Sequence, residues 1–192
     1  MKNVKKFINP IFIILTAAIL RLLPHLPNFA PISAMALFGG TYLNRKWAFA
    51  APLSAMFLSN YLLLYVNPFR TPYAIFDKVY SPLLIFSIGL LPIYLSFIFS
   101  GIIGLWLKKH KTLPNIIGAS LFCSVQFFAI TNAAVWIGGM YDRSILGLWQ
   151  SYIAGVPFFR GTFVGDLFYT ALFFGAYELS LRVSKSKATS AI

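Results

Sequence analysis

The sequence predicts an all-α, polytopic membrane protein: a compact bundle of six transmembrane helices with both termini in the cytoplasm. The first observation is composition, because 59% of the 192 residues are hydrophobic and only 10% are charged. Soluble domains carry about 25% charged residues, so this chain has too few polar side chains to coat a globule of its size. The second observation is that the apolar residues form six runs, and the third is the uneven distribution of lysine and arginine between them.

Proline, glycine and charged residues separate the six predicted spans. They are residues 7–23, 31–43, 47–66, 80–107, 115–138 and 158–181. A helix needs about 20 apolar residues to cross a bilayer. The second span is short, so we expect it either to tilt into a thinned region or to pack inside the bundle. The fourth is long, and Pro92 is expected to kink it. Residues 1–192 are predicted to form one integral membrane domain.

Lysine and arginine predict the orientation. With the N-terminus inside, eleven lie in cytoplasmic segments and four in external ones. The cytoplasmic residues are Lys2, Lys5, Lys6, Arg45, Lys46, Lys108, Lys109, Lys111, Arg182, Lys185 and Lys187. The external residues are Arg70, Lys78, Arg143 and Arg160. Cytoplasmic loops carry the excess of basic residues, so both termini are expected inside. This orientation explains the net charge of +12 without a nucleic-acid partner. No basic stripe is interleaved with exposed aromatic residues, as nucleic-acid binding would require.

The first span could instead be read as a signal peptide, because three lysines precede an apolar stretch. Arg21 interrupts that stretch, and no small-residue cleavage site lies in a favourable position. The sequence therefore favours a retained helix.

Besides Arg160 and Glu178, which lie near the two ends of the sixth predicted span, two charged residues lie inside predicted spans: Arg21 near the external end of the first and Asp166 in the outer half of the sixth. Charges at that depth are costly in hydrocarbon and normally face a partner or a water-filled cavity. By helical rise, Asn60 and Asn132 lie at similar depth in the third and fifth spans. Arg21 and Asp166 are expected to meet, either as an ion pair that fixes helix order or as the frame of an outward-facing pocket. The two asparagines favour the pocket.

Further candidates surround this pair. Trp136 follows Asn132 by one turn, while Thr162 and Thr170 flank Asp166 on one face of the last span. The outer loops add rim residues, among them His25 in a segment stiffened by prolines. The residues predicted to bind a solute are Arg21, His25, Asn28, Asn60, Asn132, Trp136, Arg160 and Asp166.

The sequence indicates no enzyme. It contains no H-E-x-x-H, G-x-S-x-G or phosphate-loop pattern. Its two histidines, His25 and His110, are predicted on opposite sides of the membrane, so a multi-histidine metal centre is not expected. A single deep acid, Asp166, leaves no paired carboxylates for acid–base chemistry. No catalytic residue, metal or cofactor is predicted.

The stretch R-L-L-P-H-L-P-N-F-A-P at residues 21–31, followed by Phe38-Gly39-Gly40, resembles the signature of an uncharacterised family of small bacterial inner-membrane proteins. The segments 131–136 and 157–160 also match that family, so the resemblance covers nearly the whole chain. It implies a multi-pass protein of the inner (plasma) membrane. The family has no activity to transfer.

More loosely, six helices with an external polar pocket are similar to the substrate-binding S components of energy-coupling-factor transporters. That likeness implies a vitamin-like small solute and docking to a separate transmembrane and ATPase module through small-residue helix faces. Ala51-x-x-x-Ala55 is the nearest counterpart of such a face, although it lies on the third span rather than the first. Two alternatives stay open: a structural or assembly protein without a ligand, and a small enzyme that acts on a lipid-linked substrate through His25.

Overall fold

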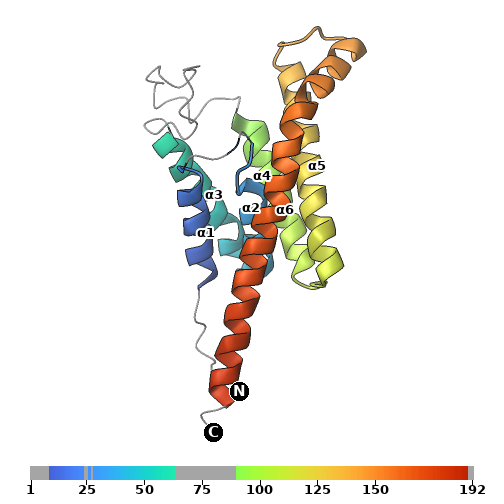
Figure 1. The fold of residues 1–192 in the computed structure, drawn as a ribbon. Helices are drawn as coiled ribbons and strands as arrows, with labels where there is room; N and C mark the ends of the chain where they lie inside the picture. The colour runs from blue at the N-terminus through green and yellow to red at the C-terminus, as the bar shows by residue number, and fades with distance from the viewer. Residues whose placement is uncertain (1–8, 24–25, 27, 64–89, 190–192) are drawn as a thin grey trace.

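The computed structural model describes residues 9–23, 26, 28–63 and 90–189, and within these ranges the chain is helical with no strand. In these ranges six helices follow one another (Figure 1). They are α1 (Pro10–Leu20), α2 (Ile32–Tyr42), α3 (Arg45–Leu63), α4 (Leu91–Leu107), α5 (Leu113–Ile137) and α6 (Ile145–Thr189). The all-α prediction is confirmed. Residues 80–89, the first part of the predicted fourth span, lie outside the described residues.

The short helix α2 is the centre of the molecule. Every residue from Ser33 to Thr41 is buried, and α2 contacts each of the other five helices in the described part of the chain (Figure 1). Its 11 residues span about 17 Å, roughly half the thickness of a bilayer's hydrocarbon core. Of the two arrangements expected for this segment, packing inside the bundle is the one observed.

Glycines allow α2 and α4 to pack backbone against backbone. A Cβ built on Gly40 would lie 2.8 Å from the Cα of Gly104 and still closer to the carbonyl oxygen of Gly101. The hydroxyl of Thr41 donates to the carbonyl oxygens of Leu37, at 2.8 Å, and Gly104, at 3.3 Å. The small-residue pair noted in the sequence, Ala51-x-x-x-Ala55, is not part of this contact. On α6, Gly165 also lies against backbone, with a built Cβ 3.1 Å from the Cα of Phe29.

A cluster of aromatic rings holds the second half of α2 against α6. Phe38 is fully buried, and its ring centroid lies 4.8–6.2 Å from those of its neighbours. These neighbours are Tyr42, Phe173, Phe174 and Tyr177. Packing of this kind adds to the stabilisation from burial alone, so the second half of α2 lies in an apolar, close-packed core.

The last helix is longer than the sequence predicts. α6 contains 45 residues and continues through Pro157, so the boundary expected at that proline is wrong and residues 145–157 form its first turns. Proline removes one helical hydrogen bond and bends a helix without always ending it. Figure 1 shows the first turns of α6 leaning away from the rest. Leu146 and Trp149, in these first turns, are well exposed.

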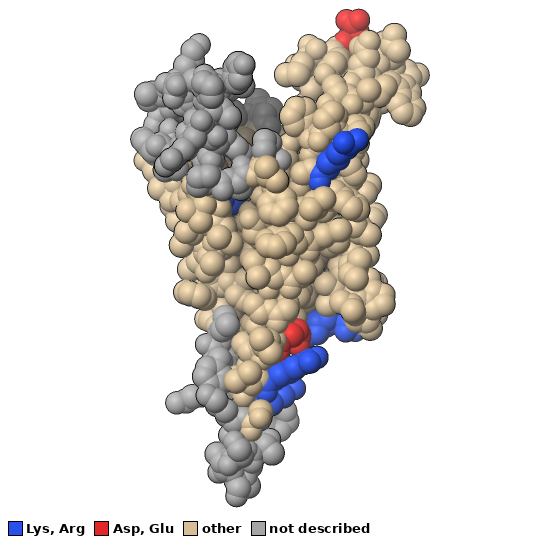
Figure 2. Space-filling model, viewed as in Figure 1, with Lys and Arg blue, Asp and Glu red and all other residues tan. Residues whose placement is uncertain are grey.

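The outer surface is largely apolar. Phe12, Phe122, Ile153 and Leu179 each expose 60% or more of their surface. On the face shown in Figure 2, charged side chains lie towards the two ends, and a broad belt of uncharged atoms separates them. By length and composition, α5 is long and apolar enough to cross a membrane, whereas α1 and α4 are apolar but shorter.

Candidate functional site

Two adjoining cavities lie between the N-terminal part of the chain and helices α5 and α6. The first, called here the polar cavity, has a volume of about 160 Å³. Its lining consists of Arg21, Asn28, Ala30, Ile32, Ser33, Phe127, Thr162 and Asp166. The second, called here the aromatic cavity, has a volume of about 150 Å³. It is lined by Asn28, Phe127, Phe128, Thr131, Asn132, Gly155, Phe158, Phe159 and Thr162. Asn28, Phe127 and Thr162 belong to both, so the two spaces are neighbours.

Asp166 reaches the polar cavity from α6 and is 1% exposed. The hydroxyl of Ser124 donates to its Oδ2 at 2.8 Å. The hydroxyl of Ser33 and the backbone N–H groups of Ser33 and Ala34 also hydrogen bond to the carboxylate.

These two N–H groups belong to the first turn of α2, where backbone donors have no partner within the helix. Pro31 precedes α2 and supplies no side-chain cap. Asp166 therefore caps α2 from a distant part of the sequence. The positive end of the helix dipole favours the negative charge, which explains how a carboxylate can be buried here without a cation beside it.

Arg21 lies at the C-terminal end of α1 and is 7% exposed. Its guanidinium donates to the hydroxyl of Ser59, to Oδ1 of Asn60 at 3.0 Å and to the sulfur of Met56 at 3.7 Å. Asn60 in turn donates to the hydroxyl of Tyr94 at 3.3 Å. All these partners are neutral. The negative end of the α1 dipole offsets part of the charge, but no carboxylate among the described residues pairs with Arg21.

Of the two arrangements expected for Arg21 and Asp166, the ion pair is not observed. Both are described, both line the polar cavity, and no ion pair joins them. The reason is that each already has other hydrogen-bond partners. Asp166 accepts from Ser124 and from the start of α2, and Arg21 donates to side chains of α3. Two opposite charges therefore lie on the wall of one cavity, with space between the helices that carry them.

The three asparagines predicted to bind a solute lie at different places relative to the two cavities. Asn28 lines both cavities and has a φ of 59°, a left-handed conformation that asparagine tolerates better than most residues. Asn132 lines the aromatic cavity, packs on Gly155 and donates to the carbonyl oxygen of Phe128 at 2.8 Å. Asn60 does not line either cavity; it holds Arg21.

Besides Asn60, two predicted residues, Trp136 and Arg160, do not line the cavities in the described part of the chain. The indole N–H of Trp136 donates to the carbonyl oxygen of Asp142 at 2.9 Å, which turns the ring towards the loop before α6. Arg160 is exposed on α6 and does not line either space. His25 lies outside the described residues. A ligand-binding role for Trp136, Arg160 and His25 stays a prediction.

Sequence reasoning missed the serines that complete the site. Ser33 and Ser124 hold Asp166, Ser59 holds Arg21, and Ser120 bonds with Thr170 at 3.0 Å. Single serines in apolar helices are too common to attract notice. The spacing of Ser120 and Ser124, one turn apart on α5, was the available signal for a polar face opposite Asp166.

Acid–base and metal groups are sparse around the cavities. The described residues contain no cluster of three or more His, Cys, Asp or Glu side chains. Cys123 is a free, buried thiol on α5. The polar cavity thus offers one guanidinium, one occupied carboxylate, hydroxyls and an amide, which is a set suited to binding a small molecule.

A model of a family of unknown function, DUF6580, matches residues 1–189. The chain belongs to this family. Membership of DUF6580 confirms the resemblance to an uncharacterised family over almost the whole sequence, while the likeness to transporter S components stays a prediction. No curated protein and no solved structure matches the chain.

Proposed function

We propose that this DUF6580 protein is a multi-pass inner-membrane protein that binds a small anionic solute in the polar and aromatic cavities, as the substrate-binding subunit of a transport system. The observation that carries the proposal is Arg21, a buried guanidinium on the wall of a cavity, held by neutral groups alone among the described residues. Leaving such a charge uncompensated is costly, so an anionic group of the solute would complete its surroundings.

Several features support a membrane location. The exposed side chains of the helices are largely apolar, charge is concentrated towards the two ends in Figure 2, and α5 has the length and composition of a membrane span. The basic residues follow the bias of cytoplasmic loops. In this arrangement α2 and the described non-helical residues before it, 28–31, would cross the membrane together. Irregular backbone is tolerated at membrane depth where it is buried in protein or lines a cavity.

The buried start of α2 supports a binding role for the cavity beside it. Many transporters place substrate sites at the ends of interrupted helices, where free backbone donors and the helix dipole are available. Here the first turn of α2 lies at Asp166, and both Ser33 and Asp166 line the polar cavity. Because the carboxylate occupies the α2 donors, Arg21 is the group left to receive a carboxylate or similar anion.

The size and lining of the cavities suggest the form of the solute. A cavity of about 150 Å³ lined by apolar side chains is large enough for a benzene-sized ring. Phe127, Phe128 and Phe159 line the aromatic cavity, and flat apolar groups fit such walls. The proposed ligand is therefore a small, vitamin-like molecule with an anionic group at Arg21 and a flat body between the phenylalanines. Because the sequence has no phosphate-loop pattern, active uptake would be driven either by a separate energising module with an ATPase or by an ion gradient.

The test is a thermal-shift screen of small carboxylates on the protein purified in detergent. Wild type should be stabilised by a compound that has no effect on Arg21→Gln. Arg45→Gln is the matched control, because Arg45 is exposed at the start of α3 and should keep the full shift. A compound that stabilises Arg21→Gln as much as wild type would refute the role of Arg21.

A purely structural role is the second candidate. It is favoured by one observation: no buried side-chain nitrogen or oxygen in the described part of the chain lacks a hydrogen-bond partner. On that reading the polar groups fix helix order, and no small molecule raises the melting temperature of any variant. The two candidates are separated by the same screen.

A further inference from the structure

An open apolar groove lies between α4 and α5, next to the loop that joins them and away from the two cavities. Its volume is about 410 Å³, and its lining includes Ile102, Ile103 and Trp106 of α4 and Asn115, Gly118 and Phe122 of α5. Trp106 and Phe122 are 50% and 60% exposed. A Cβ built on Gly118 would meet no atom within 4 Å, so the absence of a side chain there leaves the groove floor open.

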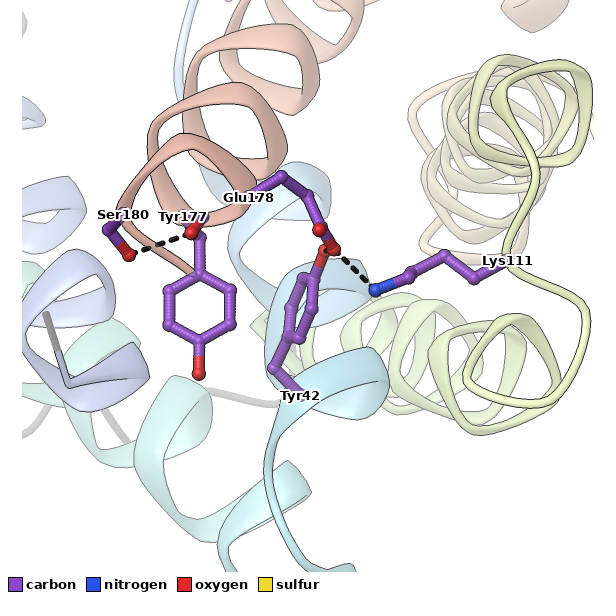
Figure 3. Close-up of polar contacts among 5 residues, drawn as sticks. All are labelled: Tyr42, Lys111, Tyr177, Glu178 and Ser180. Atoms are coloured by element: carbon purple, nitrogen blue, oxygen red, sulfur yellow. Dashed lines mark hydrogen bonds and ion pairs between the residues drawn. The ribbon is translucent and has the colours of Figure 1, made fainter. Parts of the chain in front are cut away.

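A basic loop lies at one end of this groove. Residues 108–111 read Lys-Lys-His-Lys. Two of these lysines are engaged elsewhere: Lys108 donates to the carbonyl oxygen of Leu43 at 2.8 Å, and Lys111 pairs with Glu178 (Figure 3). His110 stacks on Trp106 with ring centroids 4.9 Å apart, and its carbonyl oxygen accepts from the side chain of Asn115 at 2.6 Å. Lys109 is exposed beside them.

We propose that this groove binds an anionic phospholipid of the cytoplasmic leaflet. One acyl chain lies along the apolar groove, and the phosphate of the headgroup lies at Lys109 and His110. The inference rests on the membrane location proposed above. It follows from charge complementarity, because basic groups next to the cytoplasmic surface attract anionic lipids. In this proposal Trp106 lies at the boundary between the hydrocarbon and the headgroups, where tryptophan is enriched.

The dimensions of the groove agree with this occupant. From Pro114 to Phe122 the floor extends about 12 Å along α5, which is close to one leaflet of a hydrocarbon core about 30 Å thick. Its lining is apolar apart from Asn115, which lies at the loop end. A chain with its polar head at one end matches this lining, whereas a compact polar solute does not.

The test is native mass spectrometry of the detergent-purified full chain with phosphatidylglycerol or phosphatidylcholine of identical acyl chains. Wild type should retain phosphatidylglycerol preferentially. Lys109→Gln should weaken phosphatidylglycerol binding about fivefold, the contribution of one basic group near the surface, and leave phosphatidylcholine unchanged. Gly118→Leu should weaken binding of both lipids because its side chain fills the groove.

The matched control for the groove is Gly175→Leu, since Gly175 is also helical, exposed and without an atom within 4 Å of a built Cβ, but lies on α6. It should bind both lipids as wild type does. Equal retention of both lipids by wild type, or unchanged binding by Gly118→Leu, would overturn the lipid site. Carbonate extraction separates this failure from that of the proposed function: release of the protein from membranes would refute the membrane location and the lipid site together.

Discussion

Each end of α2 is stabilised by a charged side chain from elsewhere in the chain, and the two charges have opposite signs. At the N-terminal end, Asp166 accepts from the backbone N–H groups of Ser33 and Ala34. At the C-terminal end, Lys108 donates to the carbonyl oxygen of Leu43 at 2.8 Å. A negative group at the start of a helix and a positive group at its end both favour the dipole. Each is supplied by another helix or its end, because α2 has no charged residue of its own.

The ends differ in their access to water. Asp166 is 1% exposed, whereas Lys108 is exposed at the end of α4. Near Lys108, Glu178 lies between Tyr42, which donates to it at 2.6 Å, and Lys111 (Figure 3). At this end a lost partner is replaced directly by bulk water, whereas at the other end Asp166 and Ser33 are buried. We therefore expect the N-terminal end of α2 to depend on the charge of Asp166 for stability. This same end lies at the polar cavity.

The largest effect is expected from breaking the buried end. Asp166→Ala leaves the Ser33 hydroxyl and two backbone N–H groups without their acceptor. The Ser124 hydroxyl, by contrast, keeps the carbonyl oxygen of Ser120 at 3.3 Å. Each unsatisfied buried group costs about 1–3 kcal/mol. The free energy of unfolding should fall by at least about 3 kcal/mol, measured by denaturant titration in detergent. Asp166→Asn keeps an acceptor and should lose less. Asp142→Ala, at an exposed loop acid, is the control. A loss below about 1 kcal/mol would contradict capping by Asp166.

An intermediate effect is expected from the packing that holds α2 in place. Gly104→Ala puts a methyl group against the backbone of Leu37 and Gly40, and such overpacking costs about 1–3 kcal/mol. Gly118→Ala is the matched control, because Gly118 faces open space and alanine favours a helix. The same titration should show Gly104→Ala less stable and Gly118→Ala no less stable than wild type. Equal stability of both variants would show that the close α2–α4 contact does not exist.

The smallest effect is expected at the exposed end. Lys108→Gln removes a charge from the C-terminus of α2, where water is available to the Leu43 carbonyl. The loss should be below about 1 kcal/mol and should shrink at high salt. Melting temperatures at low and high salt measure it. A loss as large as that of Asp166→Ala would mean that the two ends do not differ as described.

Helix positions were largely predictable where the sequence has clear boundaries. The second span, predicted at 31–43, matches α2 because Pro31 precedes it and Asn44 follows it. The fifth, predicted at 115–138, differs from α5 by two residues at its start and one at its end. The start of α6 was missed because Pro157 was taken as a break, although a helix can bend at proline and continue.

The site was predictable in its residues but not in its contacts. The cost of burying charge pointed to Arg21 and Asp166, and both do line one cavity. Their partners could not be foreseen. The donors at Asp166 are partly backbone groups at the start of α2, which every helix has and no residue type marks. Asn60 was expected in a pocket, yet its amide oxygen is used to hold Arg21.

The most direct test of the central claim is to identify what leaves the purified protein when it is denatured. Mass spectrometry of the released small molecules should find an anionic compound with wild type and with the control Arg45→Gln. The compound should be lost with Arg21→Gln, which removes the cation. It should also be lost with Thr162→Leu, which puts a larger side chain into the space of both cavities. Equal recovery from all four proteins, or no enriched compound from wild type, would contradict a solute site at Arg21.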